Sequence, residues 1–119
     1  MKVLEEIINQ APVFLEDWKD TGIEGLKEEF EINDSDLNGV KILFASYERY
    51  CYEGSTFVLL EKKGLLFEVN AGHCSCYGLE NQFELEETTI GALSHRLIKG
   101  TLGEGDFGEE LKVFLGVEQ

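Results

Sequence analysis

The residue types best suited to chemistry gather in the run His73-Cys74-Ser75-Cys76, which holds two of the three cysteines of the chain. Thiolate and imidazole groups are common ligands of tetrahedral zinc. With Cys51 the run supplies four candidate metal ligands, Cys51, His73, Cys74 and Cys76, and four filled positions would make such a zinc site structural. His95, on a later predicted helix, can replace His73 in this set.

Two other interpretations of the run stay open. The C-x-C spacing is less usual for zinc than C-x-x-C, and neighbouring His73 and Cys74 point in opposite directions on an extended backbone. The cysteines can instead be buried structural thiols with a capping histidine. The run can also belong to a thiol- or zinc-dependent enzyme that uses Cys74 or Cys76 with His73. No third orienting residue or oxyanion loop can be identified, so we expect a protein that is not an enzyme.

Three predicted strands bring these residues to one end of a sheet. The strands are residues 40–47, 56–61 and 65–70. Lys62-Lys63-Gly64 predicts a short hairpin, with glycine available for a positive φ. In an antiparallel meander, Cys51 after the first strand and the cysteine run after the third strand lie at the same end. The residues expected to face the core are Phe57, Leu59, Leu65, Phe67 and Val69.

Apolar residues at helical spacing precede and follow the predicted sheet. A stripe from Val3 to Ala11 ends at Pro12, which can open a second short helix carrying Leu15 and Trp18. A third helix carries Ile23, Leu26 and Phe30. Two C-terminal helices follow, one over residues 89–99 and one after Asp106. The sequence therefore predicts an α+β fold with N-terminal helices, a three-stranded antiparallel sheet and two C-terminal helices. All of these helices are expected to cover the same face of the sheet.

The length of 119 residues and the hydrophobic content of 43% fit one domain over residues 1–119. Its predicted parts are an acidic helical part over 1–38, an antiparallel meander over 40–70, a cysteine loop over 71–87 and C-terminal helices over 88–119. No apolar run approaches the length of a membrane span, and the N-terminus is unlike a signal peptide. An odd number of cysteines agrees with a reducing compartment, so we expect a cytoplasmic protein.

The residues Asp34, Asp36, Asn38 and Gly39 match the first half of a calcium-binding loop. Such a loop needs a bidentate glutamate at its twelfth position, which is Ala45 here. An Asn-Gly turn that leads into a strand explains the run better.

The spacing Gly103-x-Gly105-x-x-Gly108 has the letters of a dinucleotide-binding loop. It follows a predicted helix rather than a strand, and Glu104 and Asp106 would repel a pyrophosphate. We therefore do not expect a dinucleotide cofactor.

Charge is the strongest global signal, because 24 acidic residues against 10 basic ones give a net charge of −14. The net charge is −8 over residues 1–38, zero over 39–76 and −6 over 77–119. Such a surface repels nucleic acids and anionic membranes and attracts basic proteins, including those that hold DNA or RNA. We therefore expect a basic host protein that binds nucleic acid as the partner, with no direct binding of nucleic acid or membrane.

The candidate partner-binding residues are acids and aromatics. The acids Glu28, Glu29, Glu31, Asp34 and Asp36 are expected to steer the partner. Tyr50, Tyr52 and Tyr77 cluster around the cysteines and either anchor the partner or simply cover the end of the sheet.

The stretch from Glu53 to Glu87 resembles a family of small proteins encoded by bacteriophages and prophages. The likeness rests on Glu53-Gly54, Phe57-Val58-Leu59, Leu66-Phe67-Glu68-Val69, His73-Cys74-Ser75-Cys76-Tyr77-Gly78-Leu79-Glu80 and Gln82-Phe83-Glu84. It covers the predicted sheet and the cysteine loop well, the C-terminal helices loosely and residues 1–38 hardly at all. By size, charge and origin the chain is similar to the small acidic anti-CRISPR and anti-restriction inhibitors.

This resemblance implies an inhibitor that binds a host defence protein, such as a CRISPR effector nuclease, through an acidic surface. The thiol- or zinc-dependent enzyme described above is one alternative. The other is an acidic accessory protein whose charge serves only solubility.

Overall fold

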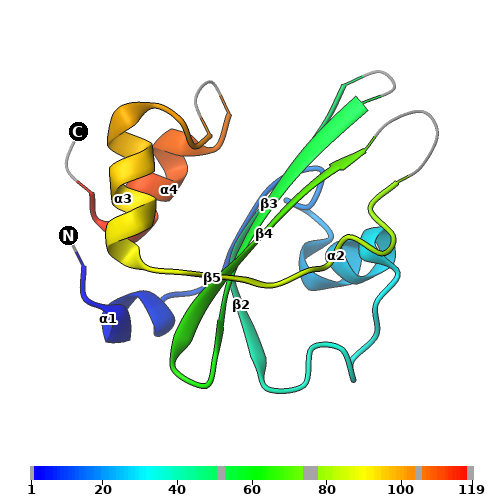
Figure 1. Ribbon diagram of the computed structural model, residues 1–119. Coiled ribbons are helices and arrows are strands. Elements are labelled where there is room, and N and C mark those ends of the chain that lie inside the picture. The colour runs from blue at the N-terminus through cyan, green and yellow to red at the C-terminus, as the bar shows by residue number, and fades with distance from the viewer. Residues whose placement is uncertain (1, 51–52, 74–77, 104–105, 118–119) are drawn as a thin grey trace.

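The computed structural model describes residues 2–50, 53–73, 78–103 and 106–117. Its elements are α1 (Leu4–Ile8), β1 (Val13–Glu16), α2 (Gly22–Phe30), β2 (Val40–Tyr50), β3 (Glu53–Lys62), β4 (Leu65–His73), β5 (Glu86–Thr88), α3 (Ile90–Lys99) and α4 (Gly108–Leu115). Figure 1 shows α1, α3 and α4 on one side of the sheet and α2 on the other. None of the helices in these ranges has the length and apolar character needed to cross a bilayer.

The sheet has five strands in the order β1-β2-β3-β4-β5. β1 runs parallel to β2, and the other neighbouring strands are antiparallel. The predicted three-stranded antiparallel sheet is therefore wrong, because β2, β3 and β4 are the centre of a larger mixed sheet. The prediction that helices cover only one sheet face is wrong as well, since helices lie on both faces.

β1 takes the place of the short helix predicted after Pro12. Its residues Val13, Phe14 and Leu15 are apolar, and β-branched and aromatic side chains favour extended backbone. They pair with Phe44 to Ser46 of β2, in the register Val13 to Phe44. This pairing gives the backbone groups along that edge of β2 a hydrogen-bonding partner, which a helix at residues 13–16 would not do.

β5 was predicted as part of the cysteine loop. It pairs antiparallel with β4, in the register Leu66 to Thr88 and Glu68 to Glu86. Only Thr88 of its three residues is buried, so the strand is defined by its backbone pairing rather than by an apolar pattern.

A β-bulge in β2 determines which side chains face which helices. The register shifts between Ile42 and Phe44, so Leu43 is an extra residue that resets the alternation. Beyond the bulge, Phe44, Ser46 and Glu48 share the face toward α3 and α4.

That face buries the larger core. Phe57 of β3 stacks on Phe107 with ring centroids 4.7 Å apart, and Phe44 lies 5.6 Å from Phe114 of α4. On the other face, Trp18 lies between Phe30 and Tyr47, with ring centroids 6.0 Å and 5.2 Å away.

The two faces divide the residues that were predicted to form one core. Phe57 and Leu59 belong to the core beneath α3 and α4, whereas Phe67 and Val69 pack on the α2 side. Leu65 is 48% exposed, so its predicted burial is wrong.

Two predicted local features are confirmed. The hairpin between β3 and β4 turns at Lys63 and Gly64, whose φ values are 55° and 81°. The helix predicted over residues 89–99 is α3, and Thr89 is its N-cap, whose side chain accepts a hydrogen bond from the backbone N of Ala92.

Candidate functional site

The predicted metal ligands lie at or after the ends of β2 and β4, and the strand register places these two ends on either side of the start of β3. Tyr50 at the end of β2 pairs with Glu53 at the start of β3, and Gly54 pairs with His73 at the end of β4. Cys51, Cys74 and Cys76 lie outside the described residues, as does the side chain of His73, so the zinc site stays a prediction. In the described ranges, no group of three or more His, Cys, Asp or Glu side chains is placed to hold a metal ion. His95 is exposed on α3.

The predicted tyrosine anchor falls on the same part of the chain. Tyr52 and Tyr77 lie outside the described residues, and only the backbone of Tyr50 is described, at the end of β2. Their role in binding therefore also stays a prediction.

The five predicted acidic residues come together over the end of α2 and the turn that follows it. Glu28, Glu31, Asp34 and Asp36 are exposed, and Glu29 is half-buried. The side chain of Asp34 is 91% exposed and forms an ion pair with Lys27, with 2.6 Å between Nζ and Oδ1.

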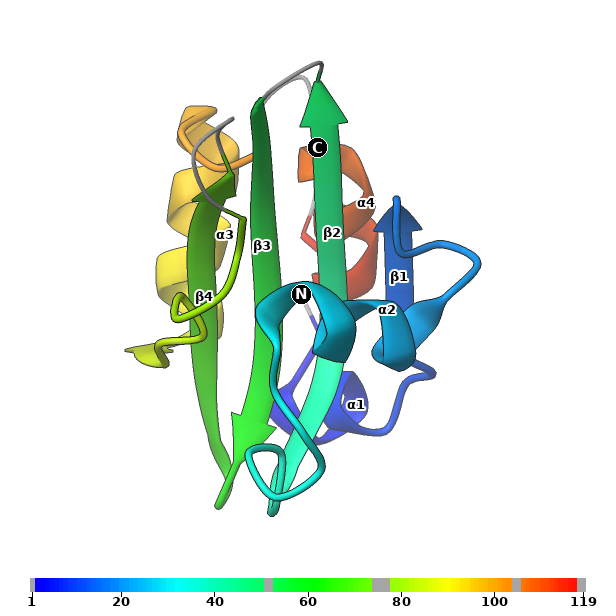
Figure 2. The ribbon, with the colours of Figure 1, turned by 90° about the vertical axis from the view of Figure 1, so that its right-hand side faces the viewer.

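These acids belong to a longer acidic segment, residues 16–36, which holds nine acidic and two basic residues. Its net charge of −7 is half of the net charge of the whole chain, −14. The segment leaves the sheet at the end of β1 and continues through α2. Figure 2 shows β1 at the edge of the sheet, with α2 in front of it and α4 behind.

The acidic residues that match a calcium-binding loop use their side-chain oxygens for a hydrogen bond and an ion pair. Oδ1 of Asn33 accepts from the backbone N of Ser35 and of Asp36, at 3.0 Å and 3.2 Å. Oδ2 of Asp36 accepts from the backbone N of Asn33 at 2.9 Å. With Asp34 held by Lys27, these acceptors order a turn and do not converge on an ion.

A cleft of about 510 Å³ opens between β3, β4 and the turn that connects α3 to α4. Phe57 and Phe107 contribute aromatic surface to it. The polar residues on its walls come from four segments and are Ser55, Thr56, Asn70, Arg96, Thr101 and Asp106.

Asp106, which lines this cleft, meets a second carboxyl group. Asp106 forms a side-chain hydrogen bond with Glu48 of β2. Burial, this hydrogen bond and the negative charges of Glu48, Glu16 and Glu110 raise the pKa of Asp106 to about 7. The pair can therefore hold one shared proton at neutral pH, because two ionised carboxylates cannot hydrogen-bond to each other.

The glycines of the rejected dinucleotide motif position Asp106. Gly103 has a φ of 67°, and its carbonyl accepts from the backbone N of Asp106 at 3.0 Å and of Gly108 at 2.8 Å. A Cβ on either glycine would come within 2.7 Å of the backbone of the other. The turn is thus a close helix–helix connection that holds Asp106 over the sheet.

Arg96, which lines the cleft, forms an ion pair with Glu68 of β4. The side chain of Glu68 is 3% exposed, and that of Arg96 is 34% exposed. Burial raises the pKa of Glu68, but hydrogen bonds from Arg96, Asn70 and Thr88 outweigh it and leave the pKa below its usual value. The charge of Arg96 is therefore matched by Glu68.

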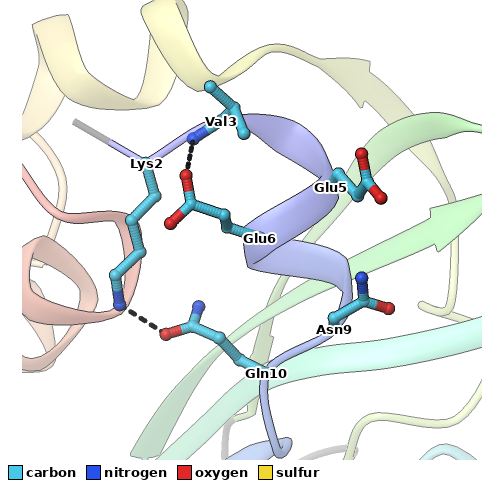
Figure 3. A pocket seen from close by; sticks show the side chains of 6 residues that line it. All are labelled: Lys2, Val3, Glu5, Glu6, Asn9 and Gln10. Carbon is cyan, nitrogen blue, oxygen red and sulfur yellow. Dashed lines mark hydrogen bonds between the residues drawn. The ribbon is translucent and has the colours of Figure 1, made fainter.

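A second hollow, beside α1, is drawn in Figure 3 and has a volume of about 510 Å³. Nζ of Lys2 donates to Oε1 of Gln10 and to the carbonyl of Val113, and Nε2 of Gln10 donates to the carbonyl of Phe114. These bonds tie the N-terminal segment to the last turn of α4 and satisfy its carbonyl groups. We assign this hollow a structural role.

The chain matches no protein-family model, no curated protein and no solved structure. Its charge and geometry are therefore what indicate a function.

Proposed function

We propose that the protein is a stoichiometric inhibitor, acting in the host cytoplasm, that binds a basic nucleic-acid-handling defence protein such as a CRISPR effector nuclease. The observation that carries this proposal is the exposed acidic segment, residues 16–36, which holds half of the net charge. Carboxylates on this segment would meet the basic surface where the partner binds phosphates.

The position of the acids within α2 supports a role in binding. Glu28 and Glu29 lie in the last turn of the helix, and Glu31 is its C-cap. The C-terminal end of a helix carries partial negative charge, so acids there destabilise the helix slightly. Their presence is therefore not explained by the stability of α2.

The sheet end would supply the rest of the contact. In this proposal Tyr50, Tyr52 and Tyr77 anchor the partner. The chain segments that carry Cys51 and His73 to Cys76 act as a structural clamp, which can hold zinc.

The test is a pull-down from nuclease-treated bacterial lysate that contains active defence systems, read by mass spectrometry. The wild-type chain is compared with a patch variant in which Glu28, Glu29 and Glu31 become Gln and Asp34 and Asp36 become Asn. We expect the wild type to retain a basic nuclease or helicase that moderate salt releases. The patch variant should lose that protein, because electrostatic attraction between the acids and the basic partner, which salt screens, steers the encounter.

A control variant separates this patch from overall charge. Changing Glu5, Glu6, Glu84, Glu87 and Glu109 to Gln neutralises the same number of exposed acids elsewhere on the surface. The control should retain the partner, and DNA should compete with the wild-type chain for it. Equal capture by the patch variant, or an empty wild-type pull-down, would refute the proposal.

A further inference from the structure

The outer edge of β1 is not paired with another strand in the described part of the chain. β1 is the first strand in the order of the sheet, and Figure 2 shows it at the right-hand edge. None of its four residues, Val13 to Glu16, is buried. Alternate residues of a strand turn their backbone N–H and C=O groups toward opposite edges, so some of these groups point away from β2. Such an edge can accept a further strand.

A groove of about 550 Å³ lies beside this edge, between the start of β1 and α4. Of the described residues that line it, four are apolar, namely Ala11, Val13, Val113 and Phe114. Val113 is 67% exposed, so α4 presents an apolar side chain to solvent here. Lys2 and Gln10 complete this side of the groove, and their hydrogen bonds to backbone carbonyls of α4 hold it in place.

Negative charge gathers at the other end of β1. Glu16 ends the strand and is exposed, and the acidic segment, residues 16–36, begins there with its net charge of −7. Glu110, in the first turn of α4, is also exposed and lines the groove. Both carboxylates contribute to the raised pKa of Asp106, so both lie near the α3–α4 turn. A strand laid along β1 would therefore meet apolar surface at Val13 and negative charge at Glu16, about 10 Å further on.

We propose that this edge binds an extended basic segment of the partner, which pairs with β1 as an added strand. An apolar side chain of that segment enters the groove, and its lysine or arginine side chains lie beside Glu16 and Glu110. This inference deepens the proposed function, on which it rests, by naming the conformation and the residue pattern of the segment that the partner contributes.

The short length of β1 explains why the groove and the charges are needed. In strand addition, backbone hydrogen bonds supply affinity, and pockets for alternate side chains supply specificity. β1 has only four residues, Pro12 before it has no N–H, and Glu16 at its end has a φ of 58°. The hydrogen bonds along so short a strand are few, so apolar burial and charge attraction must add to the affinity.

Charge favours a basic segment over a second copy of this chain as the occupant. Each copy has a net charge of −14, and pairing two copies through β1 would bring their acidic segments together. Like charges that face each other at an interface cost free energy. The same acids attract the lysine and arginine side chains of a basic protein.

The experiment is an NMR titration of the free chain with two peptides, one for each strand direction. Their sequences are Arg-Thr-Arg-Thr-Val-Thr-Val and the reverse, Val-Thr-Val-Thr-Arg-Thr-Arg, each acetylated and amidated. We expect at least one of them to shift the amide signals of residues 13–16 and 110–114. Outward-facing amides of β1 should also exchange more slowly at saturation, because they then donate hydrogen bonds to the peptide.

Changes in the peptide test each part of the proposal. Glutamate in place of arginine should abolish binding, because it repels the acids of the chain. Serine in place of valine should weaken binding about tenfold, because the groove then stays unfilled. N-methylation of alternate backbone amides should abolish binding for one of the two alternating sets and spare it for the other, since only one set faces β1.

Variants of the chain locate the site. Val113→Ser should weaken peptide binding about tenfold, and Glu110→Gln about threefold. Ile98→Ser is the matched control, because Ile98 is 68% exposed on α3 and lies outside the groove. This control should bind like the wild type.

Four results would each overturn the inference. They are no binding by either peptide, binding that Val113→Ser leaves intact, shifts that spread over many acidic residues, and N-methylation that has the same effect in both sets. Concentration-dependent shifts of residues 13–16 without peptide would overturn it too, because they would assign the edge to a second copy.

The two proposals can fail separately, because this titration needs no partner protein. Salt-sensitive capture of a basic protein without peptide binding would refute the added strand and leave the acidic segment as the binding surface. Peptide binding at β1 with an empty pull-down would refute the inhibitor proposal and leave a site for extended basic segments.

Discussion

Arg96 of α3 donates two parallel hydrogen bonds to Glu68 of β4, from Nη1 to Oε2 at 2.8 Å and from Nη2 to Oε1 at 2.9 Å. Asn70 donates a third, to Oε1 at 2.7 Å. This arrangement joins the C-terminal helix pair to the centre of the sheet through a carboxylate that is almost fully buried. A buried carboxylate is tolerated only when it is paired, so the stability of the fold should depend on the arginine.

Replacing Arg96 by Ala should lower the free energy of unfolding by about 2–4 kcal/mol at pH 7, because it leaves Glu68 buried and unpaired. Urea denaturation measures the change. The deficit should shrink as the pH falls toward 4, since protonation of Glu68 removes the unpaired charge. Lys99→Ala, an exposed change on the same helix, should stay within about 0.5 kcal/mol of the wild type. A deficit that does not vary with pH would argue for lost packing instead.

Asp106 should make the folded protein less stable as the pH rises. Its pKa is about 7 in the folded chain against an ordinary value of 3.8, so the folded state binds the proton more tightly than the unfolded state. The stability that this proton contributes is fully present below about pH 4 and is lost as the pH rises through 7. Asp106→Asn keeps a similar shape without the charge. Its Tm relative to that of the wild type should rise steadily from pH 5 to pH 8.

The control for this pH dependence is Glu87→Gln, which removes one exposed negative charge far from the carboxyl pair. General charge repulsion also weakens an acidic protein as the pH rises, and this control measures that effect. Equal Tm profiles for Asp106→Asn and Glu87→Gln would contradict a raised pKa at Asp106.

The centre of the sheet was predictable because its signals are local. The apolar run from Val40 to Tyr47 specifies one strand, and the Lys63-Gly64 turn specifies the hairpin of the next two, by residue type alone. β1 carries no such signal, since Leu15 and Trp18 also fit helical spacing. Its strand conformation comes from parallel pairing with residues 44–47, which lie far away in sequence.

The division into two cores follows from a feature that side-chain patterns do not reveal. The bulge between Ile42 and Phe44 shifts the alternation by one residue, and a strand with both faces buried has apolar residues throughout. The sequence alone therefore does not show that the side chains of such a strand are divided between two cores, one on each face of the sheet.

The carboxyl pair of Glu48 and Asp106 could not be predicted from the sequence. Glu48 and Asp106 lie on β2 and in the α3–α4 turn, and each resembles an ordinary surface acid. The nearest local signal is the pair Gly103 and Gly108, whose close contact brings the turn over the sheet. The acidic segment was predictable, because charge can be counted directly along the chain.

Gly25 and Gly91 give a matched test of the packing beneath α2. A Cβ at Gly25 would lie 2.0 Å from Oγ1 and 2.8 Å from Cβ of Thr21, and 3.0 Å from Cδ1 of Trp18. At Gly91 the nearest atom is 3.9 Å away. Alanine is the better helix former by about 1 kcal/mol at either position. Gly91→Ala should therefore raise the free energy of unfolding by about 0.5–1 kcal/mol. Gly25→Ala should lower it by about 1–3 kcal/mol, because overpacking outweighs propensity. Urea denaturation of both variants measures these changes, and a gain in stability at Gly25 would show that Thr21 and Trp18 do not pack this closely on α2.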